Sequence, residues 1–178
     1  MGYAIGLNLS KNNAARVIRL WERLARESIN SVMLNVGAQP HISLAVLADL
    51  DPAQLREDLH RFAEFTRPLS VVLSYAGTFP TAEGVVFLAP IVTHELLEVH
   101  GRLHQVLRDR GLECVEYYRP GQWVPHCTVA IDVPPEKIAA ALELSVRSEA
   151  FGPVEMDEVS LVEFPPVRDI YAFPLGAR

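Results

Sequence analysis

A short motif that occurs twice constrains this chain more than any other feature of its sequence. The first copy is Pro40-His41-Ile42-Ser43-Leu44 and the second is Pro125-His126-Cys127-Thr128-Val129. Each copy places a hydroxyl-bearing residue two positions after a histidine. Because successive side chains of an extended strand point to opposite faces, the imidazole and the hydroxyl share one face and the apolar residues share the other. The motif therefore predicts two strands that each present an imidazole and a hydroxyl.

The hydroxyl partner distinguishes these two histidines from the others in the chain. Six histidines occur in 178 residues, and neither Ser nor Thr stands two positions after the remaining ones, which are His60, His94, His100 and His104. A single histidine in a strand is typical of a structural residue. A matched pair, each preceded by proline and followed by an apolar residue, indicates instead that both copies contribute to one site.

The spacing of apolar residues predicts the same order of elements twice. In the first half we expect strands at 3–9, 32–36, 41–48 and 69–75, and helices at 14–27 and from Asp51-Pro52 to 65. In the second half we expect strands at 85–88, 114–118, 124–133, 154–164 and 170–173, a helix between Thr93 and Gly111, and another that begins at Pro134-Pro135. The repeated order indicates an internal duplication.

These elements predict an α+β fold in a single domain, residues 1–178, with two lobes at roughly 1–80 and 81–178. We expect two antiparallel-type sheets around a central groove, with the helices on the outside. A pseudo-two-fold axis between the lobes would place His41 opposite His126. Two imidazoles and two hydroxyls would then meet in one small volume, and such a set of groups is suited to binding and cleaving a phosphodiester.

The charge balance limits the partners that we expect. With 16 basic and 22 acidic side chains the net charge is −6, which argues against a broad electrostatic surface for long nucleic acid and against DNA as a partner. A small nucleotide or an RNA terminus remains compatible with this charge. Nothing in the sequence indicates an oligomeric state.

Cysteine usage and hydropathy predict a cytoplasmic protein. The two cysteines, Cys114 and Cys127, form no Cys-x-x-Cys motif and are expected to be reduced thiols. The apolar stretch 3–9 is short and has no basic lead-in, unlike a signal peptide. The longest apolar run, 85–92, contains Pro90 and is too short to span a bilayer. We therefore expect no association with membranes.

The two motifs and the duplicated order of elements, which covers nearly the whole chain, resemble the 2H (two-histidine) phosphoesterases, also called the 2′-5′ RNA ligase-like superfamily. The residues that carry the resemblance are Pro40-His41-Ile42-Ser43-Leu44 and Trp123-Val124-Pro125-His126-Cys127-Thr128-Val129-Ala130. The first motif has Ser43 where many members have threonine, and serine keeps the hydroxyl. The resemblance implies hydrolysis of a 2′,3′-cyclic phosphate on a nucleotide or RNA end, with a 2′-phosphate as product, and the reverse 2′-5′ ligation. Members differ widely in substrate, so the resemblance defines the chemistry better than the biological role.

The chemistry of the motifs agrees with this expectation. Histidine has an unperturbed pKa of about 6.5, so one imidazole can act as a base while the other, protonated, acts as an acid. His41 and His126 would deprotonate water and protonate the departing ribose oxygen, and the sequence leaves open which does which. Ser43 and Thr128 would donate hydrogen bonds to the non-bridging phosphate oxygens. This mechanism needs neither a metal nor a cofactor.

Residues near the second motif are weaker candidates for substrate binding. Trp123 and Tyr118 have aromatic rings suited to stacking on a base, and Arg119 has a guanidinium suited to a phosphate. Arg168 is a weaker candidate of the same kind. In the alternative interpretation Trp123 packs a loop and Arg119 is solvated.

Two further alternatives concern metal binding and function class. His100 and His104 have the spacing of a His-x-x-x-His zinc site, but Gly101-Arg102-Leu103 between them lacks the glutamate of zinc proteases, so a polar flank of a helix is favoured. A protein of the same fold that binds a nucleotide or RNA end without turnover is the main alternative to an enzyme. A pure interaction protein has no need for the paired motif and is disfavoured.

Overall fold

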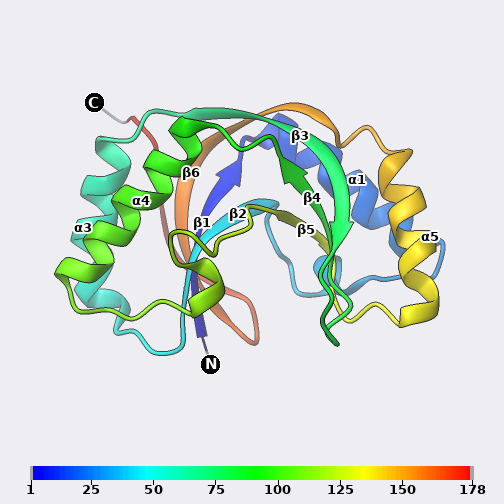
Figure 1. The fold of residues 1–178 in the computed structure, drawn as a ribbon, viewed down its shortest axis with the longest axis horizontal. Coiled ribbons are helices and arrows are strands. Elements are labelled where there is room, and N and C mark those ends of the chain that lie inside the picture. The colour runs from blue at the N-terminus through cyan, green and yellow to red at the C-terminus, as the bar shows by residue number, and fades with distance from the viewer. Residues whose placement is uncertain (1, 177–178) are drawn as a thin grey trace.

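The computed structural model describes residues 2–176 of the chain, and its longer strands and helices follow the order that the apolar pattern predicts (Figure 1). The first half contains β1 (Gly2–Leu9), α1 (Lys11–Arg26), α2 (Val32–Asn35), β2 (His41–Leu47), α3 (Pro52–Glu64) and β3 (Leu69–Thr78). The second half contains β4 (Val86–Pro90), α4 (His94–Asp109), the 3-10 turn η1 (Glu116–Tyr118), β5 (Cys127–Ala130), α5 (Pro135–Val146), β6 (Gly152–Phe164) and β7 (Arg168–Pro174).

Local side-chain chemistry sets the ends of the longer helices. The Asp51 carboxylate accepts a hydrogen bond from the Ala53 amide at the start of α3, and Pro52 is the first helical residue. At the start of α4 the Thr93 hydroxyl accepts from the Leu96 amide. Gly111 follows the end of α4 with φ +66°, a left-handed conformation that favours glycine. These boundaries confirm those expected from the sequence.

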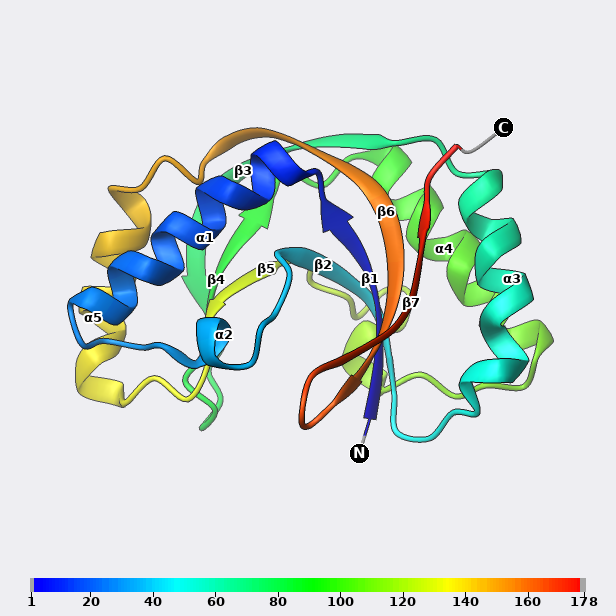
Figure 2. The ribbon, with the colours of Figure 1, turned by 180° about the vertical axis from the view of Figure 1, so that it is seen from behind.

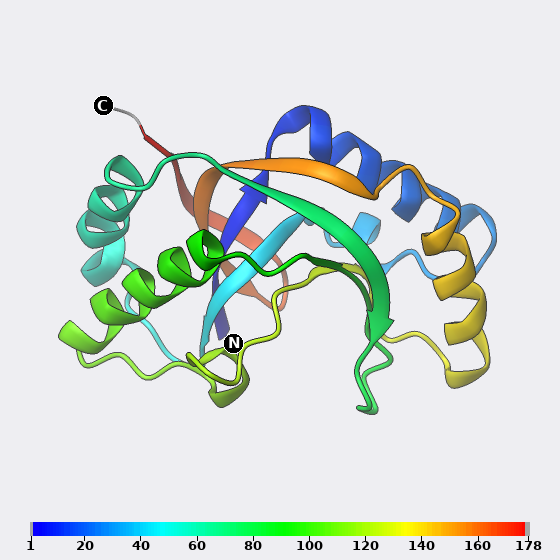
Figure 3. The same ribbon diagram turned by 45° about the horizontal axis from the view of Figure 1, so that its top comes forward.

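The strands form one sheet, so the expectation of two separate sheets is wrong. Its order is β2-β1-β6-β3-β4-β5, with β7 also paired to β6, and every pair is antiparallel. The two lobes are joined because residues 69–73 of β3 pair with residues 152–156 of β6. Figure 3 shows these two long strands crossing the middle of the molecule. Sequence patterning does not reveal this link, because it depends on which strands become neighbours.

The two halves of the sequence exchange their third strands. β3, from the first half, pairs with β4 of the second half, and β6, from the second half, pairs with β1 of the first. Each lobe therefore has three principal strands, β2-β1-β6 in one and β5-β4-β3 in the other. The strand order reads the same in reverse when β1, β2 and β3 are exchanged with β4, β5 and β6.

The sheet curves so strongly that its two end strands meet. β2 and β5 stand at opposite ends of the strand order and yet contact each other, and Figure 1 shows them side by side at the centre of the arch. Helices flank the arch, with α3 and α4 on one side and α1 and α5 on the other (Figures 1 and 2). None of the helices within residues 2–176 is both long and apolar enough to cross a membrane.

Two short strands expected from the sequence are turns. The first of them is the helix α2, Val32–Asn35, because the Asn30 side chain accepts from the Val32 amide and starts a helical turn. Residues 114–118 make one backbone bond to β2, from the Val115 amide to the Val46 carbonyl at 2.7 Å, and then close η1. The strand expected at 124–133 is shorter, because Pro125 has no amide hydrogen and Asp132 has φ +57°.

Candidate active site

A β-bulge follows the hydroxyl residue in both copies of the motif. In the β1–β2 pair, Ile5 faces Ala45 and Gly6 faces Ser43, so Leu44 is an extra residue. The same register shift occurs in the β4–β5 pair and makes Val129 the extra residue. A bulge bends its strand and redirects nearby side chains, and bulges are common beside active sites. In the sequence each bulge coincides with two consecutive apolar residues, both buried, which are Leu44-Ala45 in one copy and Val129-Ala130 in the other.

The two imidazoles are anchored in the same way. His41 Nδ1 lies 2.6 Å from the Gln39 carbonyl oxygen, and His126 Nδ1 lies 2.7 Å from the Val124 carbonyl oxygen. A carbonyl oxygen only accepts, so each Nδ1 carries the proton and donates it. Nε2 is then the nitrogen left to take or give a proton in both residues. The main chain two residues before each histidine thus defines its tautomer.

Both histidines are held toward the neutral form in the free protein. Burial lowers the pKa of His41, against an opposing effect of the bond to the Gln39 carbonyl. Burial also lowers the pKa of His126, and a charge on His41 lowers it further. An anion bound beside either imidazole would favour its protonated form.

A cavity of about 320 Å³ lies beside the first motif. His41, Ser43, Thr128 and Tyr118 are among the residues that line it, so both motifs contribute to one space. Its lining is mainly apolar and includes Met33 of α2 and residues 164–167, where β6 leads into β7. Within residues 2–176 the lining includes Asp169 but no lysine or arginine.

His126 has a different surrounding from His41. Its ring packs edge-on against Phe79 at a centroid distance of 5.0 Å, and the Phe87 ring lies tilted against it at 5.4 Å. The Tyr118 ring, which lines the cavity, is 6.5 Å from His126. His126 itself is not among the lining residues of the cavity. The aromatic side chains therefore enclose the second imidazole, while the first opens into the cavity.

The sequence matches the 2′-5′ RNA ligase superfamily over residues 14–165. The chain belongs to this superfamily. The expected membership of the 2H phosphoesterase group is thereby confirmed. No curated protein matches the sequence.

Solved structures share the superfamily fold with this chain at low identity. TT0787 of Thermus thermophilus is 18% identical, has a TM-score of 0.63, and the match covers 99% of this chain and 98% of that one. E. coli LigT complexed with 3′-AMP is 17% identical, with a TM-score of 0.63 and coverage of 97% of each chain. E. coli LigT complexed with NADP⁺ is 17% identical, with a TM-score of 0.61 and coverage of 97% of this chain and 96% of that one. At these identities the likeness establishes the fold.

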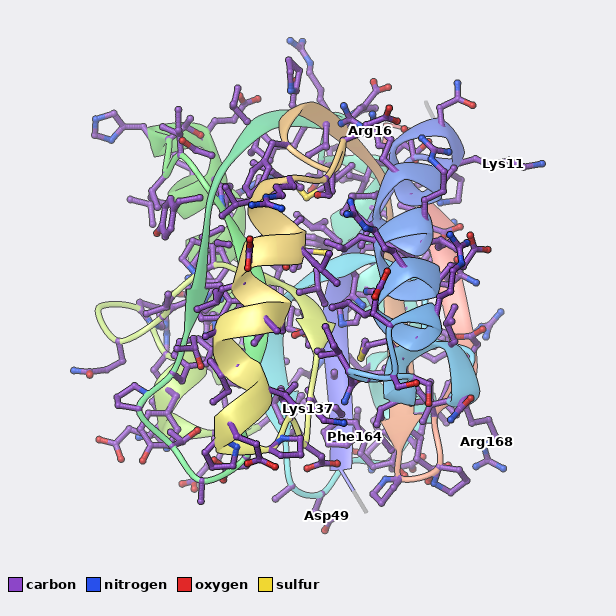
Figure 4. The ribbon with its side chains drawn as sticks, turned by 90° about the vertical axis from the view of Figure 1, so that its right-hand side faces the viewer. Lys11, Arg16, Asp49, Lys137, Phe164 and Arg168 are labelled. Atoms are coloured by element: carbon purple, nitrogen blue, oxygen red, sulfur yellow. The ribbon has the colours of Figure 1, made fainter. Side chains whose placement is uncertain are left out.

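The weaker candidates for substrate binding in this superfamily member lie in different places. Tyr118 lines the cavity. One face of Trp123 is covered by the His100 ring, at 4.0 Å and an interplanar angle of 2°, and its Nε1 donates to the Ser43 carbonyl. Arg119 donates to the Cys114 carbonyl and lines a separate cavity. Arg168 pairs with Glu163 and extends outward from the β6–β7 hairpin (Figure 4).

His100 and His104 are buried, so the expectation of a polar helix flank is wrong. Their exposed fractions are 2% and 4%, and their ring centroids are 4.3 Å apart. His100 Nε2 lies 2.9 Å from the Tyr118 carbonyl oxygen, and His104 Nε2 lies 3.2 Å from that of Leu44. Within residues 2–176 no group of three or more His, Cys, Asp or Glu side chains is arranged to hold a metal ion.

Sequence reasoning missed several residues near the motifs. Asn8 pairs across the strands with His41, lines the cavity, and donates to Glu158 while accepting from Ser160. Gly6 lies so close to His41 that a Cβ atom there would be 3.0 Å from the imidazole Cδ2. The neighbours of a strand residue depend on register, and the sequence of one strand carries no signal for it.

Proposed function

We propose that this protein is a metal-independent phosphodiesterase that opens the 2′,3′-cyclic phosphate of a nucleotide or RNA end and leaves a 2′-phosphate. The observation that carries the proposal is the matched anchoring of His41 and His126. Each imidazole donates Nδ1–H to a backbone carbonyl and keeps Nε2 for proton transfer. Each is followed by a hydroxyl that lines the same cavity, Ser43 in one motif and Thr128 in the other.

The proposed reaction needs one proton acceptor and one proton donor. One Nε2, unprotonated, takes a proton from water as the water oxygen attacks phosphorus. The bond from phosphorus to the ribose O3′ breaks on the opposite side, and the other Nε2–H gives its proton to O3′. Ser43 and Thr128 donate hydrogen bonds to the non-bridging oxygens, whose negative charge grows in the transition state.

We assign His41 as the acid and His126 as the base. The cavity beside His41 is large enough to receive the nucleoside that carries the departing oxygen. Phe79 and Phe87 surround His126 and leave that side suited to a water molecule. The bound phosphate anion raises the pKa of His41, whose burial otherwise keeps it neutral.

The substrate class follows from charge and from related structures. LigT has been crystallised with 3′-AMP and with NADP⁺, which supports nucleotide binding by this fold. In this chain the wall beside His41 is mainly apolar, which suits a nucleoside. When the 5′-hydroxyl of a second RNA replaces water as the nucleophile, its oxygen bonds to phosphorus, the bond from phosphorus to O3′ breaks, and a 2′-5′ linkage forms. This 2′-5′ ligation, the reverse of 2′-5′ cleavage, is the second activity that we propose. Buried free Cys114 and Cys127 agree with action in the cytoplasm.

A substrate screen tests the proposal. Purified protein is incubated in EDTA with the four 2′,3′-cyclic mononucleotides and with a short RNA that ends in a cyclic phosphate, and the products are separated as 2′- or 3′-phosphates. We expect 2′-phosphates at a rate that EDTA does not change. Activity lost in EDTA and restored by zinc or magnesium would overturn the metal-free mechanism. Tight nucleotide binding without turnover would favour the non-catalytic alternative.

A further inference from the structure

Two side chains bond to the outer edge of β2 at its bulge. β2 is an end strand of the sheet, and its other edge pairs with β1. At the bulge the carbonyls of two successive residues, Ser43 and Leu44, bond away from β1. Ser43 O accepts from Trp123 Nε1 at 2.9 Å, and Leu44 O accepts from His104 Nε2 at 3.2 Å. One indole N–H and one imidazole N–H thus hold the bulge in the first motif.

Trp123 joins the two motifs directly. It stands three residues before His126 in the chain and bonds to the backbone of Ser43 in the other motif. The His100 ring stacks on the indole almost parallel, at an interplanar angle of 2°. Stacking and the hydrogen bond together restrict the indole to one position. Any displacement of this side chain would move β2 relative to the segment that leads into β5.

His100 and His104 complete the same cluster. Burial lowers the pKa of His100 to about 4, with a smaller contribution from His104, and burial also lowers the pKa of His104. Both imidazoles are therefore neutral at pH 7, and each directs its Nε2–H to a carbonyl oxygen. His100 holds Tyr118, which lines the cavity, and His104 holds Leu44.

We propose that Trp123, His100 and His104 are positioning residues that fix the bulge of the first motif against the second motif. The inference rests on the proposed function. Through the Ser43 and Leu44 carbonyls the cluster sets the place of the Ser43 hydroxyl and of the His41 imidazole. Displacement of a reacting group by about 1 Å can cost on the order of a hundredfold in rate. None of the three side chains needs to touch the substrate for this role.

The test compares the two tryptophans of the chain. Trp123→Phe keeps an aromatic ring to stack on His100 but removes the N–H that bonds to Ser43 O. Trp21→Phe is the control, because Trp21 is buried where Trp123 is partly buried, and its Nε1 has no hydrogen-bond partner within residues 2–176. Both variants are checked for folding by thermal unfolding before kinetics are measured on a 2′,3′-cyclic mononucleotide.

We expect Trp123→Phe to lower kcat by about tenfold or more while KM rises no more than about threefold, because a misplaced Ser43 and His41 weaken the transition state most. Trp21→Phe should keep the wild-type kcat. The loss should be the same for all four bases and for a base-free ribose 2′,3′-cyclic phosphate. If Trp123 instead stacks on the base, the loss would appear mainly in KM and would vanish with the base-free substrate, which would overturn the inference.

A second pair of variants tests the imidazole donor. His104→Gln keeps an N–H able to reach the Leu44 carbonyl, and His104→Leu does not. We expect kcat within about threefold of wild type for His104→Gln and about tenfold lower for His104→Leu. Equal kcat for the two variants, both folded, would remove His104 from the cluster's role.

Binding of inorganic phosphate separates this inference from the proposed function. If the wild-type protein turns over no cyclic phosphate, the proposed function fails, and phosphate affinity measured from the imidazole NMR signals of His41 and His126 decides the inference. Phosphate binding weaker by about twofold to fivefold in Trp123→Phe, and unchanged in Trp21→Phe, would support the cluster's role. Equal phosphate affinity in all three proteins, with equal kcat where turnover exists, would overturn it.

Discussion

Gly6 and Phe87 occupy equivalent positions in the two lobes. Gly6 is the cross-strand partner of Ser43, and Phe87 is the cross-strand partner of Thr128. On their other sides Gly6 faces Ser160, whereas Phe87 faces Gly77. A Cβ atom at Gly77 would lie 2.8 Å from the Phe87 ring, so the phenyl group packs over Gly77 and against His126, whereas Gly6 contributes no side chain at the equivalent position. The near-symmetric fold thus has an open side at His41 and a filled side at His126.

A methyl group at Gly6 should disturb His41. In Gly6→Ala the new Cβ would stand 3.0 Å from His41 Cδ2, so the imidazole has to move. We expect kcat to fall by about 10- to 100-fold with little change in the unfolding temperature. Gly101→Ala is the control, because a Cβ there meets nothing within 4 Å, and it should stabilise α4 by about 0.5–1 kcal/mol without a change in kcat. Wild-type kcat in Gly6→Ala would show that the His41 position is not critical.

Loss of either histidine should remove most of the turnover. His41→Ala and His126→Ala should each lower kcat by about 10²–10⁴-fold, the usual contribution of a general acid or base. Because the two imidazoles act in one step, the double variant should cost little more than either single one. The measurement is single-turnover hydrolysis of a cyclic mononucleotide. Independent, multiplicative losses would contradict a shared step.

The two hydroxyls should contribute less than the histidines. Ser43→Ala and Thr128→Val each remove one donor to a non-bridging oxygen, and each should raise the activation free energy by about 2–4 kcal/mol. Thr128→Ser keeps the hydroxyl and should stay near the wild-type rate. Steady-state kinetics check this, with circular dichroism to confirm folding. A Thr128→Val rate equal to wild type would exclude Thr128 from the transition-state contacts.

The pH dependence of kcat/KM should be a bell displaced to the acid side. Turnover needs one neutral and one protonated imidazole, so the maximum lies between their pKa values. Burial lowers the pKa of both His41 and His126 in the free protein, which places the maximum below about pH 6.5. The bound phosphate anion raises the pKa of the acid, so the kcat maximum should lie at higher pH. Rates measured from about pH 4 to about pH 9 test this, because histidine titrates within that range. A kcat/KM maximum above about pH 7 would contradict the effect of burial.

Binding of RNA should depend weakly on salt. The net charge is −6, Arg168 is paired with Glu163, and Arg119 lines a cavity away from His41. We expect kcat/KM for a short RNA with a cyclic phosphate to be no higher than for the mononucleotide. Its log–log dependence on salt should have a slope of about −0.7, as for one phosphate contact with a single strand. A slope of about −2 or steeper would show that further basic residues bind the RNA.

The sequence predicts the elements of this fold better than their neighbours. Asp51-Pro52 and Thr93 are residues that favour the start of a helix, and the structure begins a helix at each of them. Residues 32–36 alternate like a strand, but the Asn30 side chain and only one core residue, Met33, make them a helical turn. The pairing of β3 with β6 joins residues about half a chain apart, which no local pattern reports.

The candidate site shows the same division. The His-x-Ser and His-x-Thr spacing predicted which side chains share a face, and the exposure of His41 and Ser43 against buried Ile42 and Leu44 confirms it. The bulges at Leu44 and Val129, the closeness of Gly6 to His41, and the hydrogen bonds of His100 and His104 all depend on register and packing. Their partners are distant in the sequence, so no motif indicates them.

The exchange of β3 and β6 between the halves bears on how such a chain could have arisen. A chain of half this length would contain only the elements β1 to β3. In it β1 would lack the neighbour that β6 provides here, and one edge of β1 would be exposed. In a dimer of two such chains, the third strand of each chain could pair with the first strand of the other, and both edges would be covered. If the halves descend from one duplicated segment, the ancestor was a strand-exchanged homodimer with one histidine motif per subunit. Fusion into one polypeptide would then free the two halves to change separately, and such a change would account for glycine at position 6 where the equivalent position, 87, has phenylalanine.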